Sequence, residues 1–279
     1  MKIAFTSDNH LQICPDSQEK LEGMIEDIRS FSPGVLCVLG DMGEGTKGIG
    51  GPSLLYETLL GSIDDTLYVL GNHDLYRSNS TRETPDISLT KNSDALFHHG
   101  IPLEPFWEDT DTVFEKGGIA FVGTIGFCDF NCPGLMPRAF YMQKRNYRTI
   151  DPRHIKLDDW TTWTDKLNSA FYKRLEKAVS LGTNGVVIST HYPCFQTHSK
   201  IDTSDSVWPY FFNYQLGQAI LEAANKYPET KFWCLAGHSH EFCAGKWGME
   251  AENLYAYGLV TSYHEQDWVG FDTEDELIS

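Results

Sequence analysis

Side chains of the types that bind metal ions occur in five short groups along the chain, each after an apolar run. The groups are Asp8-Asn9-His10, Gly40-Asp41, Gly71-Asn72-His73-Asp74, Thr190-His191 and Gly237-His238-Ser239-His240. Buried carboxylates and imidazoles gathered in one place are costly unless a cation neutralises them. Mixed oxygen and nitrogen ligands suit Mn, Fe, Zn or Co, whereas Mg and Ca prefer all-oxygen sites.

The number of candidate ligands is too large for one ion and fits two. The candidates are Asp8, His10, Asp41, Asn72, His191, His238 and His240. In the Asp-x-His and His-x-His pairs, the two side chains diverge enough at the strand end to bind at two metal positions. Each group alone is a weak signal, but all five in this order are highly specific.

The apolar runs before these groups are predicted strands, over residues 2–6, 35–39, 67–70, 186–189 and 232–236. Helical patterns lie between them, over residues 17–32, 52–63, 160–181 and 215–226. Apolar strands spaced by helices indicate a parallel sheet that is buried on both faces. A hairpin is predicted over 113–124 and a further strand over 254–260. Ligands of open α/β sheets bind at the carboxyl ends of the strands, where the five groups lie.

Composition and charge narrow the function classes. Of 279 residues, 41% are hydrophobic, which excludes a disordered chain, and no apolar stretch approaches the roughly 20 residues of a membrane span. The net charge of −17 repels duplex nucleic acid and anionic membranes. The first residues do not form a signal peptide. Seven scattered cysteines fit reduced thiols in the cytoplasm, and Cys37 and Cys234 are expected to be buried.

The five groups resemble the motifs of the calcineurin-like metallophosphoesterase family. The family pattern is Asp-x-His, Gly-Asp-x-x-Asp, Gly-Asn-His-Asp/Glu, a single His and Gly-His-x-His, and the matches cover most of the chain. The resemblance implies an α/β fold, a four-layer α/β/β/α sandwich with two mixed β-sheets. It also implies two divalent or trivalent transition-metal ions (Mn, Fe, Zn or Co). The implied ligands are Asp8, His10 and His240 for the first ion and Asn72, His191 and His238 for the second, with Asp41 bridging the two.

The same resemblance implies hydrolysis of a phosphate ester by a metal-activated water, between cations about 3.5–4 Å apart. His73 lies outside the ligand set next to Asn72, so we expect it to protonate the leaving oxygen. Two residues remain open as its orienting partner: Asp74, and Glu44, which stands where the family motif often ends in Asp. Gly45 replaces an arginine of protein Ser/Thr phosphatases, which argues against a close relative of calcineurin.

A basic segment precedes the predicted long helix. Residues 138–156 carry six basic side chains and one acidic one in a strongly acidic chain. We expect a lid over the site around residues 126–158, with Arg145 and Arg148 recognising an anionic or aromatic substrate. The alternative is a solvated loop that pairs with the acidic body. His198, which has no motif context, is expected to be structural or exposed, and substrate contact is the alternative for it.

These features predict a cytoplasmic dimetal phosphoesterase in a single domain over residues 1–279. The expected partner is a small phosphorylated substrate, most simply a phosphomonoester of a small molecule or nucleotide, and manganese is among the expected metals. Two alternatives stay open. One is a phosphodiesterase acting on a cyclic nucleotide or a nucleic acid, and the other is a non-catalytic interaction scaffold of the same fold.

Overall fold

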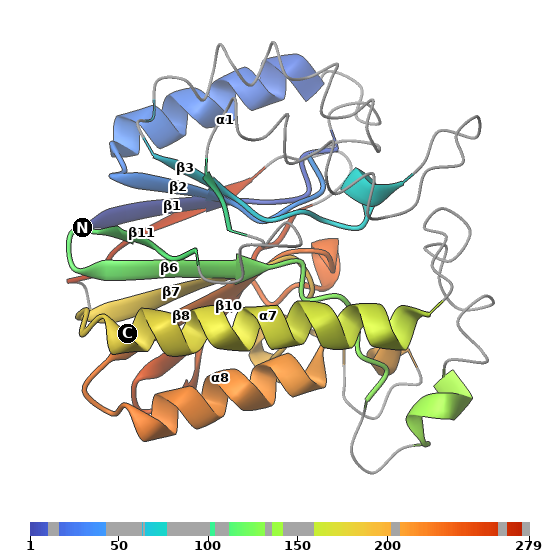
Figure 1. The fold of residues 1–279 in the computed structure, drawn as a ribbon. Helices are drawn as coiled ribbons and strands as arrows, with labels where there is room; N and C mark the ends of the chain where they lie inside the picture. Colours follow the sequence, from blue (N-terminus) through green and yellow to red (C-terminus); the bar gives the residue numbers. More distant parts are fainter. Residues whose placement is uncertain are drawn as a thin grey trace.

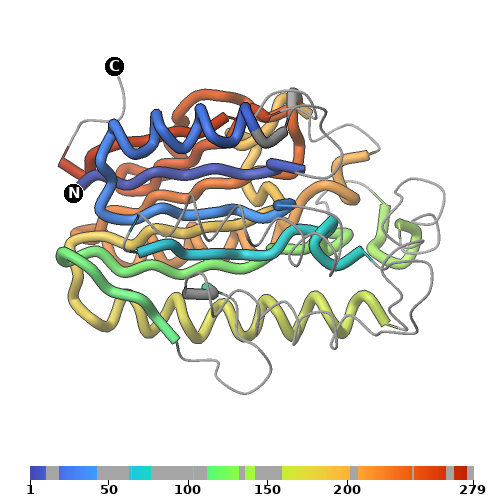
Figure 2. The backbone as a smooth tube through the Cα atoms, turned by 90° about the horizontal axis from the view of Figure 1, so that it is seen from above, coloured from blue at the N-terminus to red at the C-terminus, as the bar shows by residue number. Residues whose placement is uncertain are grey.

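Two β-sheets stack face to face at the centre of the protein (Figures 1 and 2). The computed structural model describes residues 1–10, 17–42, 63, 65–76, 101–103, 112–131, 136–141, 159–201, 207–261 and 267–274. Within these ranges the first sheet has five strands in the order β11-β1-β2-β3-β4. The second sheet has six strands in the order β5-β6-β7-β8-β10-β9.

The first sheet is parallel except at one edge. Its strands are β1 (Lys2–Thr6), β2 (Val35–Val38), β3 (Thr66–Tyr68), β4 (Ile101–Pro102) and β11 (Trp268–Asp272). β1 to β4 are parallel to one another, and β11 pairs antiparallel with β1. The three strands predicted here are confirmed as β1, β2 and β3. The apolar patterning did not predict β4 and β11.

The second sheet has a parallel centre and two antiparallel edges. Its strands are β5 (Phe114–Lys116), β6 (Ile119–Thr124), β7 (Gly185–Thr190), β8 (Lys231–Ala236), β10 (Leu254–Gly258) and β9 (Trp247–Ala251). β6, β7, β8 and β10 are parallel, whereas β5 and β9 pair antiparallel with their neighbours. The predicted hairpin is confirmed between β5 and β6. Its turn residues Gly117 and Gly118 have φ of 60° and 76°, as tight hairpin turns require.

Helices cover the outer faces of both sheets (Figure 1). α1 (Ser17–Phe31) packs Leu21, Ile25 and Ile28 against the first sheet. α7 (Trp160–Ser180) and α8 (Tyr214–Lys226) cover the second. The expected four-layer sandwich is therefore confirmed. The helix predicted over 52–63 lies outside the described residues, apart from Ile63. None of the helices in the described ranges is long and apolar enough to cross a bilayer.

Both faces of the central strands are buried, which explains their uninterrupted apolar runs. In β1, Ile3 and Phe5 point toward the second sheet, while Ala4 points toward α1. In β8, Trp233 and Leu235 face the first sheet, and Cys234 faces the helices. A strand with two buried faces has little room for charged side chains until it ends. The five groups of metal-binding side chains therefore lie at the strand ends.

Candidate metal centre

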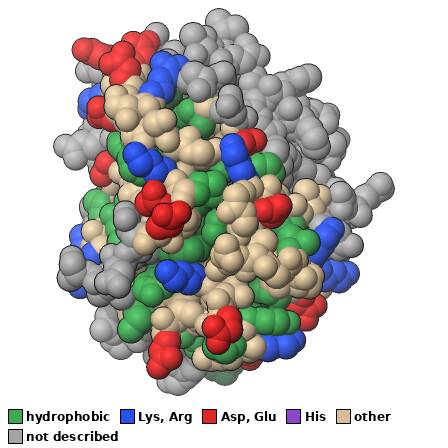
Figure 3. All heavy atoms as spheres, turned by 90° about the vertical axis from the view of Figure 1, so that its left-hand side faces the viewer, with side chains coloured by type: hydrophobic (Ala, Val, Ile, Leu, Met, Phe, Trp, Pro, Cys, Tyr) green, Lys and Arg blue, Asp and Glu red, His purple; other side chains and the backbone are tan. Residues whose placement is uncertain are grey.

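The five polar groups converge at the carboxyl ends of parallel strands. They follow β1, β2, β3, β7 and β8, whose carboxyl ends lie toward the right in Figure 1. β1 to β3 are parallel in one sheet and β7 and β8 in the other, so the loops meet at one edge of the sandwich. Figure 3 views the opposite edge, where acidic and basic side chains are intermixed. The converging edge is where ligands of such sheets bind.

One set of donor atoms lies after β1 and β8. The Nε2 atom of His240 is 3.7 Å from Asp8 Oδ1, and that of His10 is 4.0 Å from the same oxygen. The two Nε2 atoms are 3.4 Å apart. A carboxylate oxygen and two ring nitrogens at these distances can share one metal ion.

A second set lies after β3, β7 and β8. His191 Nε2 is 2.9 Å and His238 Nδ1 is 3.1 Å from Asn72 Oδ1, and the two nitrogens are 3.2 Å apart. Asp41 Oδ2 lies 3.3 Å from His191 Nε2. Carboxylate oxygen and ring nitrogen atoms of Asp41, His10 and His73 also lie within 4.8 Å of one another. The Asp41 carboxylate therefore connects the two sets.

The charge states of these groups fit metal ions. Asp8 is fully buried, and within the described part of the chain its Oδ1 accepts no hydrogen bond. Burial lowers the pKa of His10 to about 4. Burial and the neighbouring His191 also lower the pKa of His238. Neutral imidazole is the form in which histidine binds metals, so His10 and His238 beside the carboxylates fit a site for transition-metal ions.

Asp41 and His191 stabilise each other's charge at the centre of the site. Burial alone would raise the pKa of Asp41 and lower that of His191. The attraction between the two charges reverses both effects. As a result, the pKa of Asp41 lies well below its usual value and that of His191 rises to about 9. His191 Nδ1 donates to the backbone oxygen of Leu39 at 2.8 Å, which directs Nε2 toward Asp41. Outer hydrogen bonds of this kind orient metal-binding histidines.

Asp74 joins the loops that follow β2 and β3. Its carboxylate accepts hydrogen bonds from the backbone N–H of Gly71 (2.8 Å), Asp41 (2.9 Å) and Met42 (3.2 Å). Burial, and the charge of Asp41, raise the pKa of Asp74 to about 7. These contacts give Asp74 a part in positioning the ligand loops. Its expected part in orienting His73 stays a prediction.

His73 lies beside Asp41 with its ring packed between neighbours. Its Nε2 is 4.0 Å from Asp41 Oδ2, and its backbone N–H donates to Asp41 Oδ1 at 2.8 Å. The ring centroid is 4.3 Å from that of Tyr76 and 4.7 Å from that of His10. Tyr76 was overlooked in the sequence, although its place four residues after Asn72 was a usable signal. Its hydroxyl accepts a hydrogen bond from Asn72 Nδ2 at 3.0 Å.

Five residues of the site have a backbone conformation that residues other than glycine rarely adopt. The φ angle is positive at Asp8 (54°), His10 (43°), Asp41 (53°), His238 (67°) and His240 (48°). Sparsely populated backbone conformations cost about 1–3 kcal/mol each. Backbone hydrogen bonds from Asp8 to Gly40 and from His10 to Asp41, both 3.0 Å, hold two of these turns.

Two glycines allow the loops to approach closely. A Cβ atom at Gly71 would overlap Asp41 Oδ1 and lie 2.5 Å from the Asp41 nitrogen. A Cβ atom at Gly237 would overlap Ser7 Oγ and lie 2.5 Å from Asp8 Oδ2. These separations are far below van der Waals contact, so a side chain at either position would displace a donor-bearing loop.

Some of the predicted site residues lie elsewhere or outside the description. Glu44, Arg145 and Arg148 fall outside the described residues. At the start of the predicted lid, Phe127 is buried in the hydrophobic core. The expectation that His198 is a structural residue is confirmed, because its ring is fully buried and hydrogen-bonded to the backbone of the second sheet, which also excludes the alternative of substrate contact.

Comparisons with known proteins agree with the resemblance seen in the sequence motifs. A family model for calcineurin-like phosphoesterases matches residues 1–242. The phosphopantetheinyl hydrolase of Mycobacterium tuberculosis has a similar structure, with 15% identity, a TM-score of 0.70, and coverage of 100% of this chain and 98% of that one. A putative 5'-nucleotidase from Staphylococcus aureus has 12% identity, a TM-score of 0.54, and coverage of 98% and 51%. At identities this low, the TM-scores establish a shared fold and nothing further. A search of curated proteins found no match.

Proposed function

Because the chain belongs to the calcineurin-like phosphoesterase family, we propose that it hydrolyses a phosphomonoester of a small molecule or nucleotide. The family assignment makes the protein a metal-dependent phosphoric ester hydrolase that uses two metal ions. The net charge of −17 supports a small substrate, since an acidic surface repels duplex nucleic acid.

One observation carries the assignment of ligands, namely the place of the Asp41 carboxylate between the two donor sets. Asp41 Oδ2 is 3.3 Å from His191 Nε2 in the second set. A carboxylate oxygen of Asp41 also lies within 4.8 Å of a ring nitrogen of His10, which belongs to the first set. The proposed ligands of the first ion are Asp8, His10 and His240, those of the second are Asn72, His191 and His238, and Asp41 serves both.

The chemistry divides between the ions and the chain. When bound, the two ions polarise the phosphate ester and lower the pKa of a bound water. The chain supplies the proton for the leaving oxygen from His73, whose ring is held by Tyr76 and Asp41. Tyr192, stacked on His238 with a centroid distance of 3.8 Å, keeps that ring in place.

The finer parts of the proposal concern metal, location and substrate contacts. Manganese suits a donor set of carboxylates and imidazoles. None of the five cysteines in the described residues forms a disulfide within that part of the chain, which fits a reducing cytoplasm. We retain Arg145 and Arg148 as substrate contacts, within a single domain over 1–279 that carries a lid around 126–158.

Reconstitution of metal-free protein tests the proposed function. The protein is loaded with Mn, Fe, Co, Zn or Mg and assayed on p-nitrophenyl phosphate and bis-p-nitrophenyl phosphate. We expect manganese-dependent hydrolysis with the higher kcat/KM for the monoester. A higher kcat/KM for the diester would indicate a phosphodiesterase. No hydrolysis by protein holding two metal ions would favour the scaffold.

His73→Ala is expected to slow hydrolysis according to the leaving group. An alkyl phosphate, whose leaving oxygen needs a proton, should lose about 10²–10⁴-fold in kcat. The p-nitrophenyl ester has a stable leaving anion and should lose far less. Steady-state kinetics on both esters measure the difference, and metal analysis checks that two ions remain bound. Equal losses on the two esters would contradict the role of His73 as general acid.

A further inference from the structure

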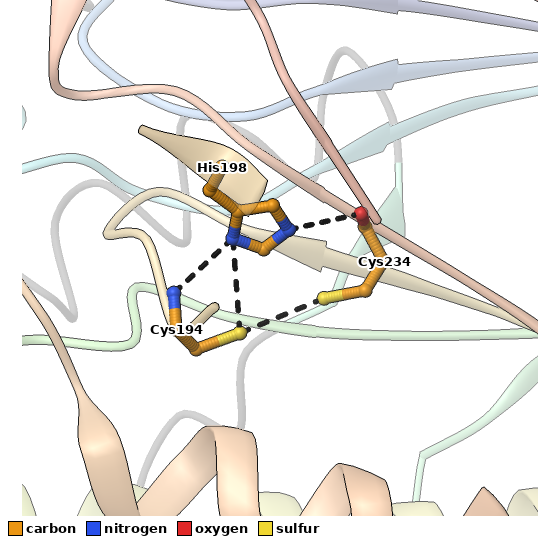
Figure 4. A group of neighbouring side chains, drawn as sticks. All are labelled: Cys194, His198 and Cys234. Atoms are coloured by element: carbon orange, nitrogen blue, oxygen red, sulfur yellow. Dashed lines mark hydrogen bonds between the residues drawn. The ribbon is translucent and has the colours of Figure 1, made fainter. Parts of the chain in front are cut away.

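Two cysteines and a histidine form a second cluster of metal-binding atoms, away from the proposed dinuclear centre. Cys194 lies between β7 and a short helical turn, η2 (Gln196–His198), His198 ends that turn, and Cys234 lies in β8. All three are buried, and their donor atoms lie within 4.8 Å of one another. Figure 4 shows the three side chains directed toward a common centre. We propose that this cluster binds one thiophilic metal ion, Zn²⁺ or Cu⁺.

The spacing of the donor atoms is that of one coordination shell. The two sulfur atoms are 3.7 Å apart, and Cys194 Sγ is 4.0 Å from His198 Nδ1. Two thiolates bound to one tetrahedral zinc ion at about 2.3 Å lie roughly 3.8 Å from each other. The chain thus holds the sulfur atoms at the separation that an ion requires, with little rearrangement.

The hydrogen bonds of His198 identify the nitrogen that carries the lone pair. Nε2 donates to the backbone oxygen of Cys234 at 3.1 Å, and Nδ1 accepts from the backbone N–H of Cys194 at 3.2 Å. Nδ1 is therefore the unprotonated nitrogen, on the side of the ring where Cys194 Sγ lies. Metal-binding histidines commonly donate their other N–H to a carbonyl, as His198 does. An ion would replace the Cys194 N–H at Nδ1.

The thiol of Cys234 differs from the other buried thiols. Burial opposes its ionisation, but contacts with Cys194 and His198 lower the pKa of Cys234, whereas burial and the contact with Cys234 raise the pKa of Cys194 well above its usual value. Burial raises the pKa of Cys37, in the first sheet, to about 12. A thiolate inside a hydrophobic core is costly without a cation beside it. The cluster therefore provides both the geometry and the ionised ligand that a thiophilic ion needs.

The donor types separate this cluster from the dinuclear centre. Two sulfurs and one nitrogen favour Zn²⁺ or Cu⁺, whereas the carboxylates of the other centre favour harder ions. Cys194 and Cys234 also belong to the core on the helix-covered face of the second sheet. Cys194 follows His191 by three residues, and Cys234 precedes His238 by four. An ion bound here would cross-link the segment that carries His191 to the segment that carries His238.

X-ray absorption of the parent protein tests the site without any substitution. Full-length protein is loaded with Zn²⁺, or with Cu⁺ under anaerobic conditions, and its metal content is measured. We expect sulfur neighbours at about 2.3 Å from the metal and one bound ion beyond the two of the dinuclear centre. The metal that shows sulfur ligation identifies the preferred ion. Loaded protein in which neither metal has a sulfur neighbour would overturn the proposal.

Variants assign the sulfur atoms. Cys194→Ser and Cys234→Ser should each lose one bound ion and sulfur neighbours, while two ions remain at the other centre. Cys37→Ser, a buried cysteine of β2, is the matched control and should keep the third ion. Sulfur ligation that persists in both test variants would contradict the site, as would a Cys194–Cys234 disulfide in peptide mass maps of the purified protein. If a variant does not fold, the X-ray absorption spectrum of the parent protein still tests the site.

Discussion

Asp41→Asn should reduce kcat/KM by at least about a thousand-fold. The substitution keeps the size of the side chain, and its oxygen can still accept the N–H of His73. It removes the negative charge that lies between the two donor sets. Loss of an outer partner of a metal ligand already costs about 10–100-fold, so loss of a shared ligand should cost more. The measurement is kcat/KM on p-nitrophenyl phosphate at saturating manganese, with bound metal determined in parallel.

Asp129→Asn is the matched control for this prediction. Asp129 is also fully buried and accepts backbone hydrogen bonds from Asn131 (3.0 Å) and Gln215 (2.7 Å), but it belongs to neither donor set. Its substitution should leave kcat/KM close to that of the parent. Activity of Asp41→Asn within about tenfold of the parent, with two ions bound, would show that no carboxylate bridge is needed.

Gly71→Ala should remove activity to a similar extent although no donor atom changes. The added methyl group would overlap the Asp41 carboxylate, so either the loop after β3, with Asn72 and His73, or the loop that carries Asp41 must shift. Displacements of about 1 Å at a catalytic site can cost a hundredfold in rate, and here ligands of both ions move. Steady-state kinetics and metal binding should both be impaired, while circular dichroism should retain the parent spectrum.

Gly23→Ala supplies the control for Gly71→Ala. Gly23 lies in α1, and among the described residues no atom outside its own stretch of helix lies within 4 Å of the place that its Cβ would take. The variant should keep full activity and gain about 0.5–1 kcal/mol in free energy of unfolding, because alanine favours the helix. Parent-like activity of Gly71→Ala would refute the need for the close approach.

Features that depend on neighbours along the chain were accessible from the sequence. Residues such as Ile3 and Phe5 alternate with others that face α1, and burial on both sides leaves an apolar run that identifies the strand. The same burial confines Asp8 and His238 to strand ends. The donor groups could therefore be placed at one edge before their distances were known, and the family resemblance supplied the mixed sheets.

Features that depend on pairing between distant segments were not accessible. β9 and β11 are half-buried edge strands, so their sequences lack a continuous apolar run. Cys234 was expected to be a buried small residue, and it is buried. Its contact with Cys194 joins residues 40 positions apart, and no rule of sequence spacing predicts such a contact. The backbone hydrogen bonds of Asp74 are likewise a property of two loops brought together by the fold.

The left-handed backbone of the site residues has a consequence for how the protein can evolve. Glycine tolerates positive φ better than aspartate or histidine, so replacing His240 (φ 48°) or Asp8 (φ 54°) with glycine would relax the turn and remove a proposed ligand. Thermal resistance and turnover thus favour different residues at these positions. A lineage selected for heat tolerance alone would drift toward the relaxed residues and lose turnover first, while its fold persisted.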